Sequence, residues 1–70
     1  MQYKSHIDKE KFSKLAKGQP FQYRDVVADD FPASQHTMDG VLFKKEVESG
    51  VFTGAEVADE DETHIIYRKL

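Results

Sequence analysis

The sequence contains no cysteine, which removes two of the ways in which short chains are usually stabilised. Disulfides and thiolate zinc sites are both excluded. A chain of 70 residues buries only about 60% of the surface that its unfolded form exposes. We therefore expect a single domain over residues 1–70 that depends on one hydrophobic core, with residues 1–6 as a disordered tail.

Long apolar runs are also missing from the chain. None approaches the ~20 residues needed to span a bilayer, and the first ten residues lack the apolar stretch of a secretory signal. The absence of cysteine agrees with a reducing compartment. These features predict a cytoplasmic protein with no membrane partner.

Recognisable catalytic and metal-binding motifs are absent as well. No G-x-S-x-G, Walker or G-x-G-x-x-G pattern occurs, and the histidines have no metal-ligand spacing. The acids from Asp59 onward lack the glycine that a calcium loop places at its sixth position, where His64 stands. We therefore expect a protein that is not an enzyme and that has no metal and no cofactor.

The charges that are present are distributed unevenly. The formal net charge is −3, but residues 1–24 hold six basic and two acidic side chains, whereas residues 25–70 hold four basic and eleven acidic ones. This asymmetry predicts either a polar surface for a partner or a solvated surface that keeps a small protein in solution.

The first predicted elements are a helix and a short strand. A helix is expected over residues 8–17, with Asp8 as its N-cap and with Ile7 and Phe12 packed together as a hydrophobic staple. Gly18 and Pro20 should end it. Residues 21–23 should then be extended, because Pro20 biases the entry to this segment towards an extended conformation.

Two further helices are expected in the middle of the chain. The second should cover residues 24–30 and stop before Pro32. The third should cover residues 35–49, with Ser34 as its N-cap and Gly50 as a left-handed C-cap. Apolar residues occupy two sides of this third helix, which indicates either a central position or a second apolar face directed at a partner.

The last segment predicts an antiparallel hairpin between residues 51–57 and 63–69. A loop centred on Glu60 would pair Val57 with Thr63 and Thr53 with Tyr67. The expected core draws on all these elements and consists of Phe12, Leu15, Phe21, Val26, Val27, Leu42, Val47, Ile65 and Tyr67.

The order of these elements, together with four short stretches, resembles the winged helix-turn-helix family. The stretches are residues 21–27, which resemble the strand that enters the second helix, 34–38 at the start of the recognition helix, 47–52 at the junction with the wing, and 65–70 in the final strand. The resemblance implies an α+β fold with three helices, a short strand after the first helix and a C-terminal β-hairpin wing.

The resemblance also implies a small transcriptional regulator that binds DNA in the cytoplasm as a homodimer, because one such domain reads few bases. The third helix would then present polar and basic side chains to the major groove. Asp39 would point the same way. The candidate DNA-binding residues are Arg24, Gln35, His36, Thr37, Lys44 and Lys45.

The wing departs from this pattern, because its predicted tip carries acids where a DNA-contacting wing usually offers lysine or arginine. Carboxylates at a groove edge oppose the phosphate neutralisation that supplies much of DNA affinity. The alternative is therefore a protein-binding winged helix, and a third hypothesis is an accessory domain of a larger machine. The candidate protein-binding residues are Phe43, Asp59, Glu60, Asp61 and Glu62.

Overall fold

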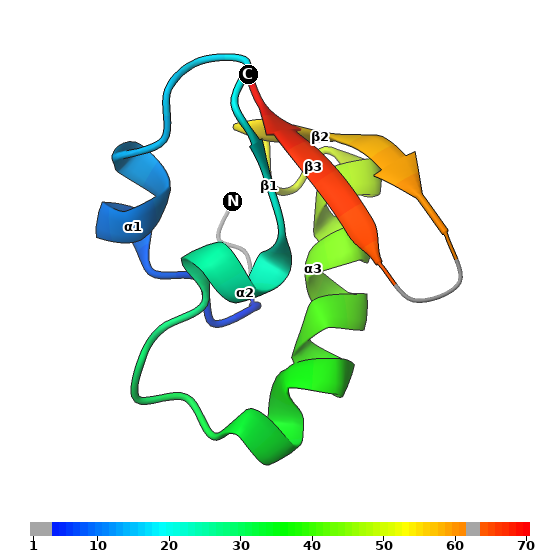
Figure 1. Cartoon of the computed structure of the whole chain (residues 1–70). Helices are drawn as coiled ribbons and strands as arrows, with labels where there is room; N and C mark the ends of the chain where they lie inside the picture. The colour runs from blue at the N-terminus through cyan, green and yellow to red at the C-terminus, as the bar shows by residue number, and fades with distance from the viewer. Residues whose placement is uncertain (1–3, 62–63) are drawn as a thin grey trace.

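The computed structural model describes residues 4–61 and 64–70. The elements follow one another as α1 (Lys9–Ser13), β1 (Pro20–Phe21), α2 (Tyr23–Val26), the 3-10 turn η1 (Ala33–Gln35), α3 (His36–Ser49), β2 (Ala55–Glu60) and β3 (Ile65–Lys69). Strand β3 lies between β1 and β2, and both pairings are antiparallel (Figure 1). The predicted α+β class, with three helices and a C-terminal hairpin, is confirmed at this level.

Helix α1 begins as predicted and ends earlier. The carboxylate of Asp8 accepts hydrogen bonds from the backbone amides of Glu10 and Lys11, so the expected N-cap is present. The helix stops at Ser13 instead of continuing to residue 17. Lys69, from the other end of the chain, donates to the carbonyls of Phe12 and Leu15 at 3.0 and 2.8 Å. A distant cation therefore satisfies carbonyls that a longer helix would have used internally.

Helix α2 is also shorter than the predicted span of residues 24–30. Val27 already has an extended backbone and pairs with Ile7 in an isolated antiparallel bridge. The amide of Ala28 donates to the carbonyl of His6 at 2.9 Å. The N-terminal segment, which includes part of the expected tail, thus competes for the backbone groups that would have extended α2.

Helix α3 differs from its prediction in two respects. Ser34 lies inside η1 and does not cap the helix, whose N-cap is Gln35. The helix also faces the core through Phe43, which is fully buried, whereas Leu42 is only half-buried and lies outside the core cluster. The predictions that Leu42 belongs to the core and that Phe43 is available to a partner are therefore wrong. The C-cap is as predicted, because Gly50 adopts φ 83°.

The hairpin is present, but its predicted register is wrong. Val57 pairs with Tyr67, and a bulge between Val57 and Asp59 then brings Glu60 opposite Ile65. Residues 51–54 form turns and not a strand, because Phe52 turns inward to the core. A side chain at Gly54 would force the ring of Phe12 to shift, since a Cβ at this position would lie 2.8 Å from that ring.

The core lies between the sheet, α3 and the N-terminal segment. Phe43 is at its centre, with ring centroids 5.0 Å from Phe52 and 4.8 Å from Tyr67. The predicted members Phe12, Leu15 and Ile65 are only partly buried and pack against its edge. The buried hydrophobic residues are Ile7, Phe21, Val26, Val27, Phe43, Val47, Phe52, Ala55 and Tyr67.

Candidate nucleic-acid interface

A groove of about 630 Å³ separates residues 36–44 of α3 from the β2–β3 hairpin, and the N-terminal end of α2 closes one side of it. We call it the α3 groove. Four of the six residues predicted to bind DNA line it, although they come from separate parts of the chain: Arg24, His36, Thr37 and Lys44. The fold therefore brings most of this candidate set into one place.

The other two candidates lie beside the groove and not in it. Gln35 is the last residue of η1, and Lys45 is on the outer side of α3; both are exposed. The predicted protein-binding residues Glu60 and Asp61 line the groove, and Asp59 is exposed in β2. Glu62 lies outside the described residues.

The acidic side chains of the hairpin are engaged within the molecule. Lys44, on α3, donates a hydrogen bond to the carboxylate of Glu60, on β2, and this contact raises the pKa of Lys44. The carboxylate of Asp61 accepts a hydrogen bond from the backbone amide of His64 at 2.7 Å. Two of the four acids of the predicted turn, Asp59 and Glu60, thus lie in β2, and Glu60 connects that strand to α3 through its hydrogen bond with Lys44.

Two cations, one in the wall of the groove and one beside it, have no such neutralisation. Within residues 4–61 and 64–70, the side chains of Arg24 and Lys45 form no ion pair or hydrogen bond, and both are exposed. They lie at the α2 side of the groove and on the outer side of α3, respectively. A negatively charged ligand would therefore find free positive charge at the α2 side of the groove and on the outer side of α3.

The opposite side of α3 is buried and carries two acids. The carboxylate of Asp39 accepts hydrogen bonds from the amide of His6 at 3.0 Å, from its Nδ1 at 2.8 Å and from the hydroxyl of Tyr23. Glu46 accepts from the amide of Ser5 at 3.1 Å and from the Ser5 hydroxyl. These bonds hold residues 4–6 against α3, so Asp39 does not point towards a DNA groove as the resemblance implied.

The contact between Asp39 and Tyr23 shifts the pKa of both groups. Burial alone would raise the pKa of Asp39, but the hydrogen bonds from Tyr23 and His6 outweigh it and lower that pKa. Burial, and then the same contact with Asp39, raise the pKa of Tyr23 well above its ordinary value. Sequence reasoning missed this network, although the spacing of Asp39, Phe43 and Glu46 already places them on one helical face.

His36 is held in place by aromatic packing. Its ring stacks on Phe31 with a centroid distance of 5.8 Å, and Tyr23 meets it edge-on at 5.7 Å. Its Nε2 lies 3.2 Å from the carbonyl oxygen of Phe31. The His36 side chain is therefore packed into the wall of the groove and does not extend from it. Thr37 is the exposed polar residue of this first turn.

Among residues 4–61 and 64–70, no three histidine, aspartate or glutamate side chains gather closely enough to hold a metal ion. None of the helices in that part of the chain has the length and apolar character that crossing a bilayer requires.

Comparison of the chain with protein-family models, with curated proteins and with solved structures finds no match.

Proposed function

We propose that this chain is a winged-helix protein that binds duplex DNA, with α3 as the recognition helix and the β2–β3 hairpin as the wing. The observation that carries the proposal is the α3 groove itself, which gathers Arg24, Thr37 and Lys44 along residues 36–44 of α3. Recognition helices of this class use their N-terminal residues to contact base edges. The sheet order, with β3 between β1 and β2, supports the same assignment.

The proposal depends on the charges close to α3 and not on the net charge of the chain, which is −3. Binding requires cations at the phosphates that flank the helix, and Arg24 and Lys45 are exposed on its two sides. Lys44 becomes a third cation once its pairing with Glu60 is broken. A single domain of this size reads few base pairs, so we propose that it binds as a homodimer at two half-sites.

Arg24→Ala tests the proposal directly. We expect the affinity of the wild type for duplex DNA to fall steeply with salt, because neutralised phosphates release counterions. Losing one phosphate contact should weaken binding roughly five- to tenfold near 0.1 M salt. It should also reduce, by about 1, the magnitude of the slope of log affinity against log salt concentration. The measurement is a fluorescence anisotropy titration at several salt concentrations.

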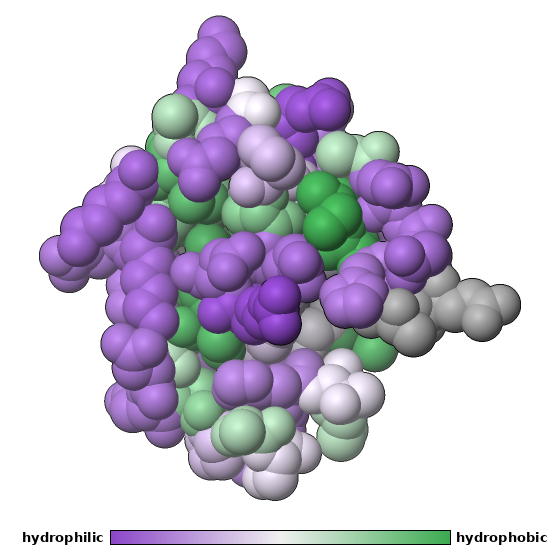
Figure 2. Space-filling model, viewed as in Figure 1, coloured by the Kyte–Doolittle hydropathy of each residue, from purple (hydrophilic) through white to green (hydrophobic). Residues whose placement is uncertain are grey.

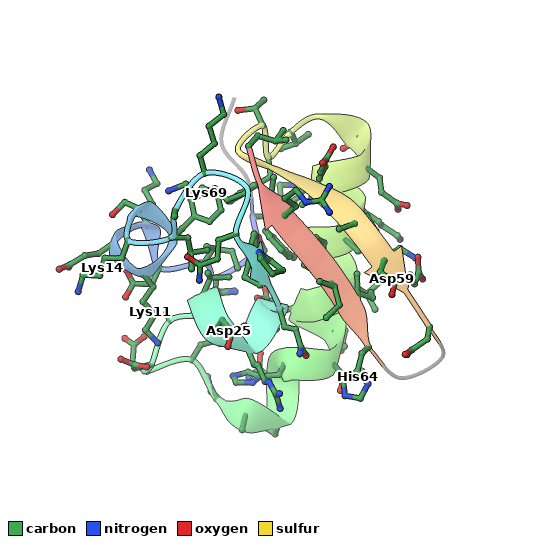
Figure 3. The ribbon with its side chains drawn as sticks, turned by 45° about the horizontal axis from the view of Figure 1, so that its top comes forward. Lys11, Lys14, Asp25, Asp59, His64 and Lys69 are labelled. Atoms are coloured by element: carbon green, nitrogen blue, oxygen red, sulfur yellow. The ribbon has the colours of Figure 1, made fainter. Side chains whose placement is uncertain are left out.

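Lys14→Ala is the matched control, because it also removes one exposed cation. Lys14 is the C-cap of α1, pairs with Glu10 at 3.8 Å, and lies on the opposite side of the molecule from Asp59 and His64 in the hairpin (Figure 3). The control should bind as the wild type does. Equal losses of DNA affinity for the two variants would show that DNA is attracted to any exposed lysine or arginine. If the wild type does not bind a random-sequence duplex pool at low salt, the proposed function is rejected.

A second candidate function is binding to a basic protein surface. The observation that favours it is the combination of Met38, 79% exposed, and Val41, 52% exposed, with the carboxylates of the hairpin. Exposed apolar residues beside charged ones are typical of protein interfaces.

Glu60→Gln separates the two functions. If the ligand is DNA, this variant frees Lys44 and removes a negative charge at the groove, so affinity should rise by roughly five- to tenfold near 0.1 M salt. Asp59→Asn removes the same charge from β2 without freeing Lys44, and it should produce a smaller gain. Both affinities are measured by the same titration.

A basic protein partner would respond in the other direction. Loss of a complementary charge slows association, so Glu60→Gln would then reduce the on-rate for that partner and leave DNA binding undetectable. A gain in DNA affinity no larger than that of Asp59→Asn would contradict the part assigned to Lys44.

A further inference from the structure

The outward side of α3 carries an exposed apolar strip at its first two turns. Met38 and Val41 are 79% and 52% exposed. Residues three apart on a helix are neighbours on its surface, so the two side chains lie side by side. Thr37, four residues before Val41, adds an exposed methyl group to the same strip. Figure 2 shows hydrophilic side chains over most of the face seen in Figure 1, with hydrophobic ones in small separate areas.

Charged and polar groups bound this strip. Lys45 is four residues after Val41, on the same side of the helix, and Arg24 lies at the other edge of the groove. Both are free of ion pairs within the described part of the chain. An apolar strip with one cation beyond its end and another across the groove is complementary to a ligand that offers apolar groups beside negative charge.

Duplex DNA offers that combination in its major groove. The C5-methyl group of thymine is the one apolar group on the base edges there, and the remaining positions are hydrogen-bond donors and acceptors. At any other position on the base edges, the apolar side chains of Met38 and Val41 would cover these donors and acceptors without pairing them. Their positions differ by about 4.5 Å along the helix axis, which is comparable with the ~3.4 Å rise per base pair.

We propose that Met38 and Val41 select thymine at neighbouring base pairs, by contact with the C5-methyl groups, while Arg24 and Lys45 hold the flanking phosphates. This inference rests on the proposed function, because it assumes that α3 enters the major groove. It adds the class of sequence that the helix reads and the two residues that read it.

The experiment begins by enriching a random-sequence duplex pool on the wild-type protein. Thymine should be enriched at two neighbouring positions. The enriched duplex is then remade with deoxyuridine at those positions, which removes only the methyl groups and keeps every hydrogen-bonding edge. Affinity should fall by about fourfold for each methyl group, the equivalent of burying one CH₂ or CH₃ group.

Variants of the strip complete the test. The double variant Met38→Ala and Val41→Ala should bind the thymine and deoxyuridine duplexes equally, and circular dichroism should show an intact fold because both side chains are exposed. Leu70→Ala is the control, because Leu70 is similarly exposed, at 55%, and the C-terminus lies at the opposite end of the molecule from the first turn of α3 (Figure 1). It should keep the preference for thymine.

The outcomes distinguish this inference from the function on which it rests. Binding without thymine enrichment, or equal affinity of the wild type for the two duplexes, would overturn the inference and leave DNA binding in place. Discrimination that persists in the double variant would assign the methyl contacts to other residues and overturn it as well. If the wild-type protein retains no duplex from the pool at low salt, the proposed function itself is overturned.

Discussion

Replacing Phe43 with alanine is expected to lower the free energy of unfolding by about 3–5 kcal/mol, as large-to-small changes of buried aromatic residues do. The Phe43 side chain is fully buried and contacts the rings of Phe52 and Tyr67. A domain of this size has little stability to lose, so the variant should show a much lower melting temperature or no cooperative transition. Urea or thermal denaturation followed by circular dichroism measures the change.

Leu42→Ala is the matched control for this prediction, because it truncates a large apolar side chain one position away on the same helix. Leu42 is half-buried and lies outside the core cluster. We expect it to cost about 1 kcal/mol or less, near the range of ordinary surface changes. A larger loss for Leu42→Ala than for Phe43→Ala would mean that α3 is rotated about its axis, with Leu42 and not Phe43 facing the core.

Asp39→Ala is expected to cost about 2–4 kcal/mol. The variant leaves the Tyr23 hydroxyl and the His6 amide without their acceptor, and each unsatisfied donor costs about 1–3 kcal/mol when it is buried. Asp30→Ala is the control, because Asp30 is an exposed acid in the turn that precedes η1, and it should change stability by no more than about 0.5 kcal/mol. Chemical denaturation at pH 7 compares the two variants.

The same carboxylate predicts how stability responds to acid. The pKa of Asp39 is lower in the folded chain than its ordinary value of 3.8. Its contribution is therefore present above about pH 4 and is lost as the pH falls through the folded pKa. Melting temperatures of the wild type should fall in that range more than those of Asp39→Ala. Parallel acid profiles for the two proteins would contradict a stabilising contact at this carboxylate.

The fold redistributes the charge asymmetry of the sequence. Lys11, from the basic half, pairs with Asp29 of the acidic half, and Lys69 folds back onto the carbonyls at the end of α1. Figure 3 shows Lys11 and Lys14 at the α1 side and Asp59 in the hairpin at the other. The distribution of charge on the folded chain therefore depends on the positions of its unpaired cations more than on the net charge of each half of the sequence.

The sequence by itself determined the order of the elements and several of their ends. Asp8 and Gly50 act within one or two turns of their own position, as a side-chain cap and as a left-handed residue. The buried residues Phe21, Val26, Val27, Val47 and Tyr67 were also predictable. Each of these features depends on local backbone chemistry or on a simple apolar pattern, so neighbouring residues are sufficient to specify it.

Only the tertiary structure decided the rotation of α3, the register of the hairpin and the composition of the α3 groove. The helix turns Phe43 inward because Asp39 and Glu46, on the same face, find donors in residues 4–6. The hairpin shifts because Phe52 enters the core, which brings Glu60 to Lys44. Periodicity within one segment carries no information about these partners, because they lie in other elements and are chosen by the free energy of burying polar and apolar groups together.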